Sequence, residues 1–194
     1  MSSEIKANKL SPGSGIDVAM GDSGDKFTFA SGSEVILTGV TKTGFGSNAP
    51  AFSVCTNAIT AITAATNEKI VLDREIVDSN SAFDTSTYRF TVPAGQAGIY
   101  VIHAGINFLM ASSSTTSNIQ TLLYLNGAEH GTSDSVITNQ ANITNLTVEG
   151  TWMLDLADGA EIELWGYVSG TSTQYNGNAT LQKTHMSGFK LIGV

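Results

Sequence analysis

The segment YRFTVPAGQAGIYVIHAGINFL, residues 88–109, carries the strongest structural signal in this chain. Residues 88–92 have a short strand pattern, which ends at the turn composition PAGQAG of residues 93–98. Residues 99–109 follow with the longest strand pattern in the sequence. The segment therefore predicts two strands joined by a turn, and no helix between them.

Similar strand patterns, separated by turn residues, continue on both sides of this segment. They cover residues 51–55, 120–125, 145–155, 161–168 and 186–194, together with 68–77, which is either one strand or two strands broken near Asp73. Asn126-Gly127 is the strongest short hairpin signal, and only residues 58–65 could form a helical turn. Regularly spaced strands without crossover helices predict an antiparallel sandwich or barrel.

The composition favours a β-rich globular chain and argues against several other classes. Charged residues make up 13% of the 194 residues, against about a quarter in an average domain, while hydrophobic residues reach 41%. Disordered chains combine low hydrophobicity with high charge, and helical proteins build their exposed faces from Lys, Glu and Arg, so neither class fits. The net charge of −8 would repel phosphates, and we therefore expect no nucleic acid as a partner.

The first part of the chain has shorter strand patterns than the rest. Residues 15–21, 27–29 and 34–38 alternate apolar and polar side chains, with turn residues between them. Strands this short are marginal alone, so they either pack against copies of themselves, as in fibrous trimeric prisms, or form an extended arm on a partner surface. We place the boundary in the loop-like residues 41–50. This divides the chain into an N-terminal β-rich attachment or trimerisation arm, residues 1–45, and a head domain, residues 46–194.

Cysteine usage and hydropathy bear on the expected location. Cys55 is the single cysteine, so no internal disulfide can form. We expect no signal peptide, because the N-terminal residues lack a sufficient apolar stretch, and no membrane span, because no apolar run approaches ~20 residues. The protein is then made in a cytoplasm, where it stays or from which it leaves inside a larger assembly.

The order of short motifs from Phe52 onward resembles the globular head of complement C1q, a jelly roll shared in architecture with the tumour necrosis factor family. The motifs that carry this resemblance are Phe52-Ser-Val54, Ile70-Val-Leu-Asp73, Phe83-Asp84, Phe90-Thr-Val-Pro93, Gly98-Ile-Tyr100, Leu123-Tyr-Leu-Asn-Gly127, Met153–Leu156, Gly159–Leu164 and Ser187–Leu191. No single motif is specific, but the ordered set covers about three-quarters of the chain. The implied fold class is all-β: an antiparallel jelly-roll sandwich preceded by the short-stranded N-terminal β arm.

The resemblance also implies a homotrimer. Subunits of this kind pack one apolar face around a threefold axis, and so few charges allow close approach without burying unpaired ions. Tyr100, Ile102 and Phe189 are the candidates for the axial core or the sandwich core. The sequence leaves open whether all three lie inside one subunit.

The N-terminal block is similar to the openings of structural proteins from tailed bacteriophages. It reads SSEIKANKL at residues 2–10, then GIDV at 15–18 and GDSGD at 21–25. The chain lacks the collagen repeat, signal peptide and cysteine pair of animal complement chains. The two resemblances imply a homotrimeric phage virion protein that binds other virion proteins through residues 1–45. Its head would bind a host-surface receptor or glycan, as a short tail fibre or spike.

Two alternatives to this role stay open. The chain could be a capsid decoration or cement protein of the phage head, or a free soluble lectin-like module. An enzyme is not expected, because no motif predicts catalysis. Glu161 and Glu163 share one face of a strand, but their alternation with apolar residues is typical of a solvated sheet face rather than a glycosidase pair.

The sequence predicts no metal site with assigned ligands. His103, His130 and His185 are far apart in sequence, and none is at ligand spacing from another histidine or cysteine. Calcium is a reasonable cofactor only by the resemblance, since family members often hold it with loop carboxylates near the top of the trimer. Carboxylates in or beside predicted loops are Asp78, Asp84, Asp134, Asp155 and Asp158. A turn aspartate more often hydrogen-bonds its own backbone, so calcium stays unassigned.

Two polar, uncharged loops are the expected binding surface. They cover residues 111–118 and 169–178 and are rich in hydroxyl and amide groups, which suit glycans or a host surface polymer. The candidate binding residues in these loops are Ser113, Thr115, Asn118, Gln174, Tyr175 and Asn176. Tyr175 could stack on a sugar face; the alternative is that these are simple solvated loops at the rim of a sandwich.

Overall fold

The computed structural model describes residues 48–110, 118–136, 144–170, 173–178 and 180–191. All regular structure within these ranges is β, with strands β1 to β13. No helix in the described ranges is long and apolar enough to cross a membrane. The predicted arm, residues 1–45, lies outside the described residues, so its assignment stays a prediction.

The larger of the two sheets is built around β7, the strand that the longest sequence pattern predicts. Its members are β1 (Ala51–Cys55), β2 (Thr60–Ala61), β4 (Arg74–Asp78), β7 (Gly98–Met110), β10 (Asn145–Leu156), β12 (Thr173–Tyr175) and β13 (His185–Lys190). They follow the order β2-β12-β7-β13-β1-β4, and β10 pairs with β7 along nearly its whole length. We call this seven-stranded sheet the first sheet.

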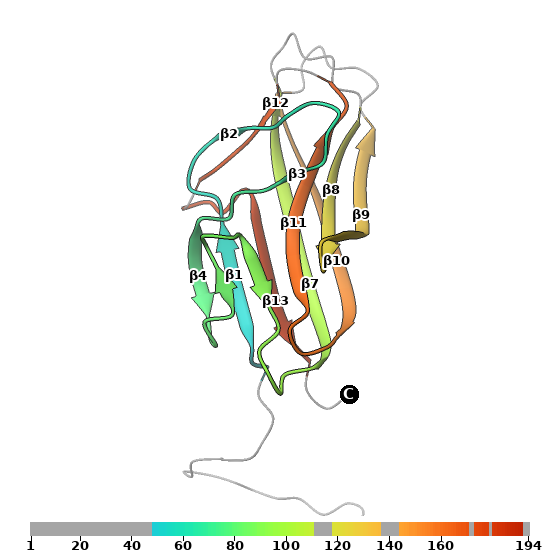
Figure 1. Cartoon of the computed structure of the whole chain (residues 1–194). Coiled ribbons are helices and arrows are strands. Elements are labelled where there is room, and N and C mark those ends of the chain that lie inside the picture. Colours follow the sequence, from blue (N-terminus) through green and yellow to red (C-terminus); the bar gives the residue numbers. More distant parts are fainter. Residues whose placement is uncertain (1–47, 111–117, 137–143, 171–172, 179, 192–194) are drawn as a thin grey trace, which may run out of the picture. The chain divides into compact units, whose positions relative to one another are not determined.

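The second sheet has six strands. Its members are β3 (Glu68–Lys69), β5 (Phe83–Asp84), β6 (Arg89–Thr91), β8 (Asn118–Leu125), β9 (Ala128–Val136) and β11 (Glu161–Val168). Their order is β5-β6-β11-β8-β9, and β3 pairs with the far end of β11. Every pairing in both sheets is antiparallel, and Figure 1 shows β4 and β9 at opposite edges of the resulting sandwich.

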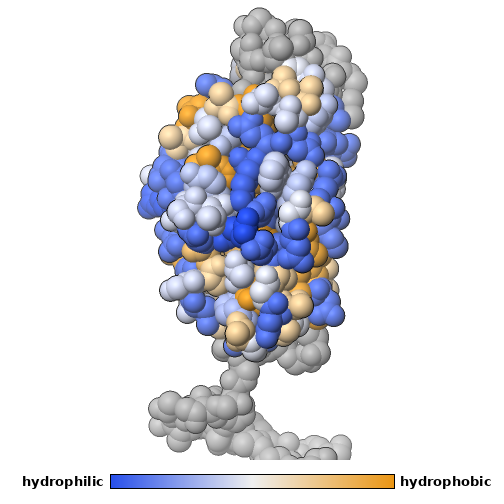
Figure 2. Space-filling model, in the orientation of Figure 1, coloured by the Kyte–Doolittle hydropathy of each residue, from blue (hydrophilic) through white to orange (hydrophobic). Residues whose placement is uncertain are grey.

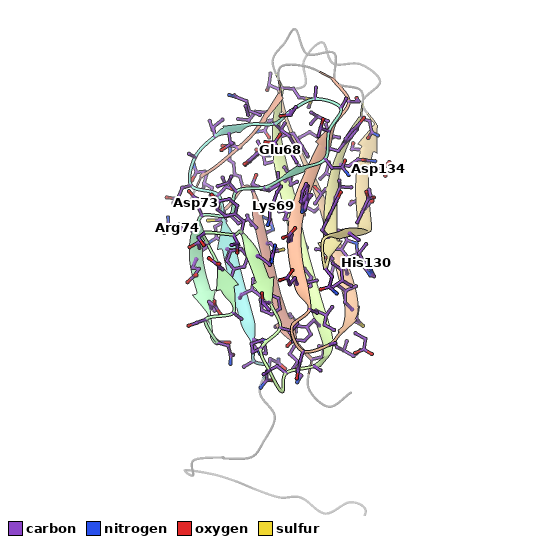
Figure 3. All side chains as sticks on the ribbon, viewed as in Figure 1. Glu68, Lys69, Asp73, Arg74, His130 and Asp134 are labelled. Atoms are coloured by element: carbon purple, nitrogen blue, oxygen red, sulfur yellow. The ribbon has the colours of Figure 1, made fainter. Side chains whose placement is uncertain are left out.

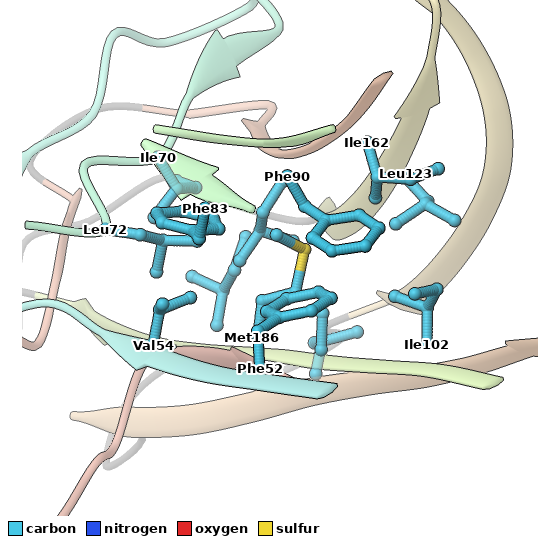
Figure 4. Close-up of a cluster of buried hydrophobic side chains, with 14 of the residues drawn as sticks. Phe52, Val54, Ile70, Leu72, Phe83, Phe90, Ile102, Leu123, Ile162 and Met186 are labelled. Atoms are coloured by element: carbon cyan, nitrogen blue, oxygen red, sulfur yellow. The ribbon is translucent and has the colours of Figure 1, made fainter. Parts of the chain in front are cut away.

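The core lies between the two sheets, where the inward side chains of each strand meet. Alternate residues of β7, from Tyr100 to Phe108, point inward and are fully buried. Phe52 of the first sheet stacks on Phe90 of the second, with ring centroids 4.4 Å apart. Figure 4 shows this apolar contact continuing through the middle of the sandwich, with Ile162 and Leu123 on one side. The period-two patterns of the sequence therefore mark the core faces correctly.

Most of the predicted elements are present, with some differences. The predicted strand 51–55 has the same bounds as β1, and residues 68–77 are broken into β3 and β4 on either side of Asp73. Residues 58–65 contain the short strand β2 instead of a helical turn. Asn126 and Gly127 have φ of 52° and 79°, the left-handed pair that a two-residue hairpin between β8 and β9 requires.

Candidate functional site

The first sheet has one side turned away from the core, and we call this side the outer face. Because antiparallel partners point to the same side, the register places side chains of β10, β7 and β13 in rows. One row contains Met153, Val101 and Phe189, and the next contains Thr151, His103 and Ser187. The outer face therefore combines apolar and small polar side chains.

Several large apolar side chains on this face are exposed. Met153 is 69% exposed, Val77 of β4 is 50% exposed and Phe189 is 37% exposed. Between them lie small side chains such as Ser187 and Ser53, which pair across β13 and β1. Isolated exposed apolar residues are normal, but a row of them on a flat sheet is typical of a surface that packs against another.

The three candidates for the axial or sandwich core divide between two places. Tyr100 and Ile102 are fully buried between the sheets, so they belong to the core of one subunit. The Tyr100 hydroxyl donates a hydrogen bond to the carbonyl of Gln96 at 2.8 Å, and burial raises its pKa to about 12. Phe189 points out from the outer face. This division follows from the alternation of side chains along a strand. Tyr100 and Ile102 are two positions apart on β7 and share its inward face, whereas Phe189 pairs with Val101, which lies between them and points outward.

The opposite surface, on the second sheet, carries a network of charges around Glu163. Its carboxylate accepts hydrogen bonds from Lys69 Nζ at 2.7 Å, Arg89 Nε at 2.9 Å and Trp165 Nε1 at 2.9 Å. Arg89 also pairs with Glu161 at 2.7 Å. Burial raises the pKa of Glu163, but the three hydrogen bonds outweigh it and leave the pKa lowered. The predicted solvated face is wrong for Glu163, which is 4% exposed, because the side chains of Lys69, Arg89 and Trp165 pack on its carboxylate.

Aromatic rings and amides extend this network over β8. Trp165 stacks on Tyr124 with ring centroids 4.4 Å apart, and the amide of Asn67 donates to the Tyr124 hydroxyl at 2.9 Å. Figure 3 labels Lys69 on the segment that pairs with β11, and Figure 2 shows hydrophilic residues gathered over the middle of this side. The second sheet thus presents a polar surface in which Lys69, Arg89, Glu161 and Glu163 are paired with one another.

The loop candidates do not form one surface in the described residues. Gln174 is exposed, and Asn118, at the start of β8, is half-buried. Tyr175 and Asn176 are buried, so their prediction as surface binding residues is wrong. Ser113 and Thr115 lie outside the described residues.

The burial of Tyr175 has a structural cause. Its hydroxyl accepts a hydrogen bond from the backbone N–H of Val71 at 3.2 Å, which ties β12 to the segment between β3 and β4. Burial raises its pKa. A ring in this position supports the sandwich and cannot stack on a sugar.

Three of the carboxylates considered for calcium are engaged with nearby loop atoms. Asp158 accepts backbone N–H bonds from residues 95–97 at 2.7 to 2.9 Å, and the bond from Gly95 contributes most to lowering its pKa. Asp84 accepts from the hydroxyls of Ser86 and Thr87 and from the Ser86 N–H, and these bonds lower its pKa to about 2. Asp78 accepts N–H bonds from residues 80 and 83. This is the ordinary role of an aspartate in a turn.

The other two carboxylates lie in strands. Asp134 is in β9 and Asp155 is in β10, on different sheets. Calcium therefore stays an expectation without ligands assigned to it.

Comparison with known proteins gives two relatives from Bacillus subtilis strain 168. The chain is 32% identical over 118 residues to the uncharacterized protein YqcC, and 29% identical over 133 residues to the phage-like element PBSX protein XkdV. These matches cover 59% and 66% of the chain, but only 30% and 18% of the relatives, so the chain spans less than a third of either protein. No family model matches the chain.

Solved structures resemble the described head. The globular domain of zebrafish complement 1qA matches with a TM-score of 0.53 at 16% identity, over 73% of this chain and 97% of that domain. The Eiger tumour necrosis factor of S. frugiperda matches with a TM-score of 0.55 at 11% identity, over 74% and 93%. Murine APRIL matches with 0.53 at 10% identity, over 73% and 98%. The chain therefore has the jelly-roll fold of complement C1q and tumour necrosis factor heads. Its sequence is also similar to that of a phage-element protein.

Proposed function

We propose that this chain is a structural protein of a bacteriophage virion, a homotrimer that attaches through residues 1–45 and displays its jelly-roll head to the host surface. The observation that carries the proposal is the similarity to the phage-like element protein XkdV over 66% of the chain, combined with the jelly-roll head. The same similarity supports a virion location. The short tail fibre or spike is the form of the protein that we favour.

The outer face supports the trimeric part of the proposal. Met153, Val77 and Phe189 expose apolar surface on one sheet, and the charged side chains that the register places on the same face include Glu149 and Asp155 of β10 and Arg74 of β4. Burying such a face against other copies removes apolar area from water at a gain of about 25 cal/mol per Å². Few ions would lose their hydration in the process.

The ion pairs of the second sheet argue against a catalytic role for its two glutamates. A catalytic carboxylate must be free to exchange a proton or attack a substrate, and Glu163 is instead saturated by three donors. Glu161 shares Arg89 with it. This pair therefore has a structural task, and incubation with host capsule or lipopolysaccharide should release no reducing ends.

The location of the chain on the particle tests the function most directly. Phage particles from the genome that encodes the chain are labelled with gold-conjugated antibody against it and imaged. Label at the tail tip supports the tail fibre or spike, label over the capsid supports a decoration protein, and particles without label support a free lectin-like module.

A competition experiment tests the host-surface role of the head. Purified full-length chain should reduce phage adsorption to host cells when it is added first. A version without residues 1–45 should compete equally well but should no longer join particles. Unchanged adsorption at saturating protein would contradict host binding, and a truncated chain that still assembled would contradict attachment through the arm.

A further inference from the structure

Three neighbouring strands bring two histidines and one carboxylate together on the outer face. The potential ligand atoms of His103 on β7, Glu149 on β10 and His185 on β13 all lie within 4.8 Å of one another. The two imidazole rings are tilted against each other with centroids 5.2 Å apart. Among the described residues, these three form the group of histidine and carboxylate side chains with the spacing of a metal site.

Gly105 creates the space in which these side chains meet. It pairs with Glu149 on one side and with His185 on the other, so both side chains stand beside a position that has none. A Cβ at this position would lie 2.8 Å from Cγ of Glu149 and 3.1 Å from Cε1 of His185. Only a glycine lets the carboxylate and the imidazole lean toward each other across β7 without displacement.

Each histidine is oriented by a hydrogen bond at Nδ1. The Nδ1 of His185 lies 3.0 Å from the carbonyl oxygen of Gln182, and the Nδ1 of His103 lies 3.0 Å from the Thr151 hydroxyl. Because a carbonyl only accepts, Nδ1 of His185 carries the proton, and its Nε2 keeps a lone pair. Metal-binding histidines are fixed in this way by a partner on the second ring nitrogen.

We propose that His103, Glu149 and His185 bind one divalent transition-metal ion of the zinc class, with a further coordination position open to water. Two imidazoles and one carboxylate form a donor set that zinc uses when it has three protein ligands. Metal–nitrogen distances of about 2.0 to 2.1 Å place tetrahedral ligands about 3.3 Å apart, so small side-chain rotations close the observed spacing. Glu149 is exposed and can make most of that movement.

The donor set also selects the class of ion. Calcium takes six to eight oxygen ligands, roughly, and this site offers one carboxylate. Imidazole nitrogen suits zinc, cobalt, nickel and copper instead.

The third histidine supplies a matched control. His130 lies on β9 of the second sheet, where Figure 3 shows it at the far edge of the sandwich, and it is exposed. The test uses the full chain without a histidine tag, stripped with a chelator. Zinc binding is measured by isothermal titration calorimetry, and cobalt binding by its visible absorption.

The expected result is one zinc ion per chain, with at least tenfold weaker binding in His103→Ala, His185→Ala and Glu149→Gln and unchanged binding in His130→Ala. Glu149 is exposed, so its variant folds even if a histidine variant does not, and circular dichroism of the metal-free proteins checks this. The proposal is overturned if zinc does not bind, if Glu149→Gln and His103→Ala bind it as the parent does, or if calcium competes equally. A ratio of one ion per three chains also overturns it, because the ion would then be shared between copies.

Discussion

Glu163 is a buried charged residue on the second sheet, and three hydrogen-bond donors stabilise its carboxylate. Glu163→Gln keeps the shape but leaves Lys69 and Arg89 without their shared anion. Removing one partner of a buried ion pair is strongly destabilising, and partial exposure of the two cations reduces the effect here to about 2 kcal/mol of unfolding free energy. Chemical denaturation at neutral pH measures it. Glu161→Gln is the control, with a loss of about 0.5 kcal/mol, since its single ion pair is partly exposed.

The same carboxylate predicts a pH dependence. The folded-state pKa of Glu163 is lowered below its ordinary value of 4.5, so the unfolded chain takes up a proton first as the pH falls. Glu163 therefore contributes its full stability above about pH 4.5 and loses it as the pH falls through the folded-state pKa. The difference in melting temperature between the parent and Glu163→Gln should shrink below this pH. A difference that stays constant down to acid unfolding would show that the charge is not the stabilising feature.

A substitution of Tyr175 tests whether this residue supports the fold rather than binding a ligand. Tyr175→Phe removes the acceptor of the Val71 N–H in a buried place, which should lower the free energy of unfolding by about 1 to 2 kcal/mol. Competition for host adsorption, measured with the purified variant, should be unchanged. If Tyr175→Phe no longer competes for adsorption but is as stable as the parent, Tyr175 takes part in binding after all.

At the scale of the residue, the sequence predicts to which face of a strand a side chain points. It does not predict which other residues contact that side chain. Period-two alternation places Glu161 and Glu163 on the same side of β11, as the structure does. It does not reveal that β3 pairs with the far end of β11 and brings the Lys69 side chain onto Glu163. The proximity of His103 and His185 likewise depends on the pairing register of β7 and β13, which sequence spacing does not contain.

At the scale of the elements, Trp152 links β10 to the second sheet. Its indole occupies the space that side chains at Gly131 of β9 and Gly150 of β10 would take. Gly131→Ala should lower the free energy of unfolding by about 1 to 3 kcal/mol, because the new Cβ collides with the ring. The same substitution in a Trp152→Ala background should have little effect, and a denaturation double-mutant cycle measures the coupling. Equal losses in both backgrounds would assign the effect to β9 itself.

The strands that the sequence predicts least well are those without an apolar face. β9, with the sequence AEHGTSDSV, is paired only on one side by β8 and carries polar residues throughout. Alternation cannot mark such an edge strand, and only the Asn126-Gly127 hairpin signal indicates it. β1, β7 and β11 face the core, and the sequence predicts them nearly to their bounds.

At the scale of the whole molecule, the order of motifs predicts the jelly roll, but not which face meets another copy. The few charged residues are distributed along the whole sequence, but the fold places them unevenly on the two sheets. The ion pairs of Lys69, Arg89 and Glu163 lie on the second sheet, whereas the exposed apolar row of Met153 and Phe189 lies on the first. Because of this asymmetry between the two sides of the sandwich, we propose the outer face as the surface for subunit packing.

That asymmetry gives a matched pair of substitutions for the proposed trimer. Met153→Lys puts a charge into the apolar row of the outer face, where three copies of it would have to lose water in one interface. Thr91→Lys adds the same charge at an exposed position of β6, on the second sheet. Sedimentation equilibrium should show a trimer for the parent and for Thr91→Lys, and an association at least tenfold weaker for Met153→Lys. If Thr91→Lys dissociates the assembly and Met153→Lys does not, the subunits pack through the second sheet, and the ion pairs around Glu163 belong to the interface instead.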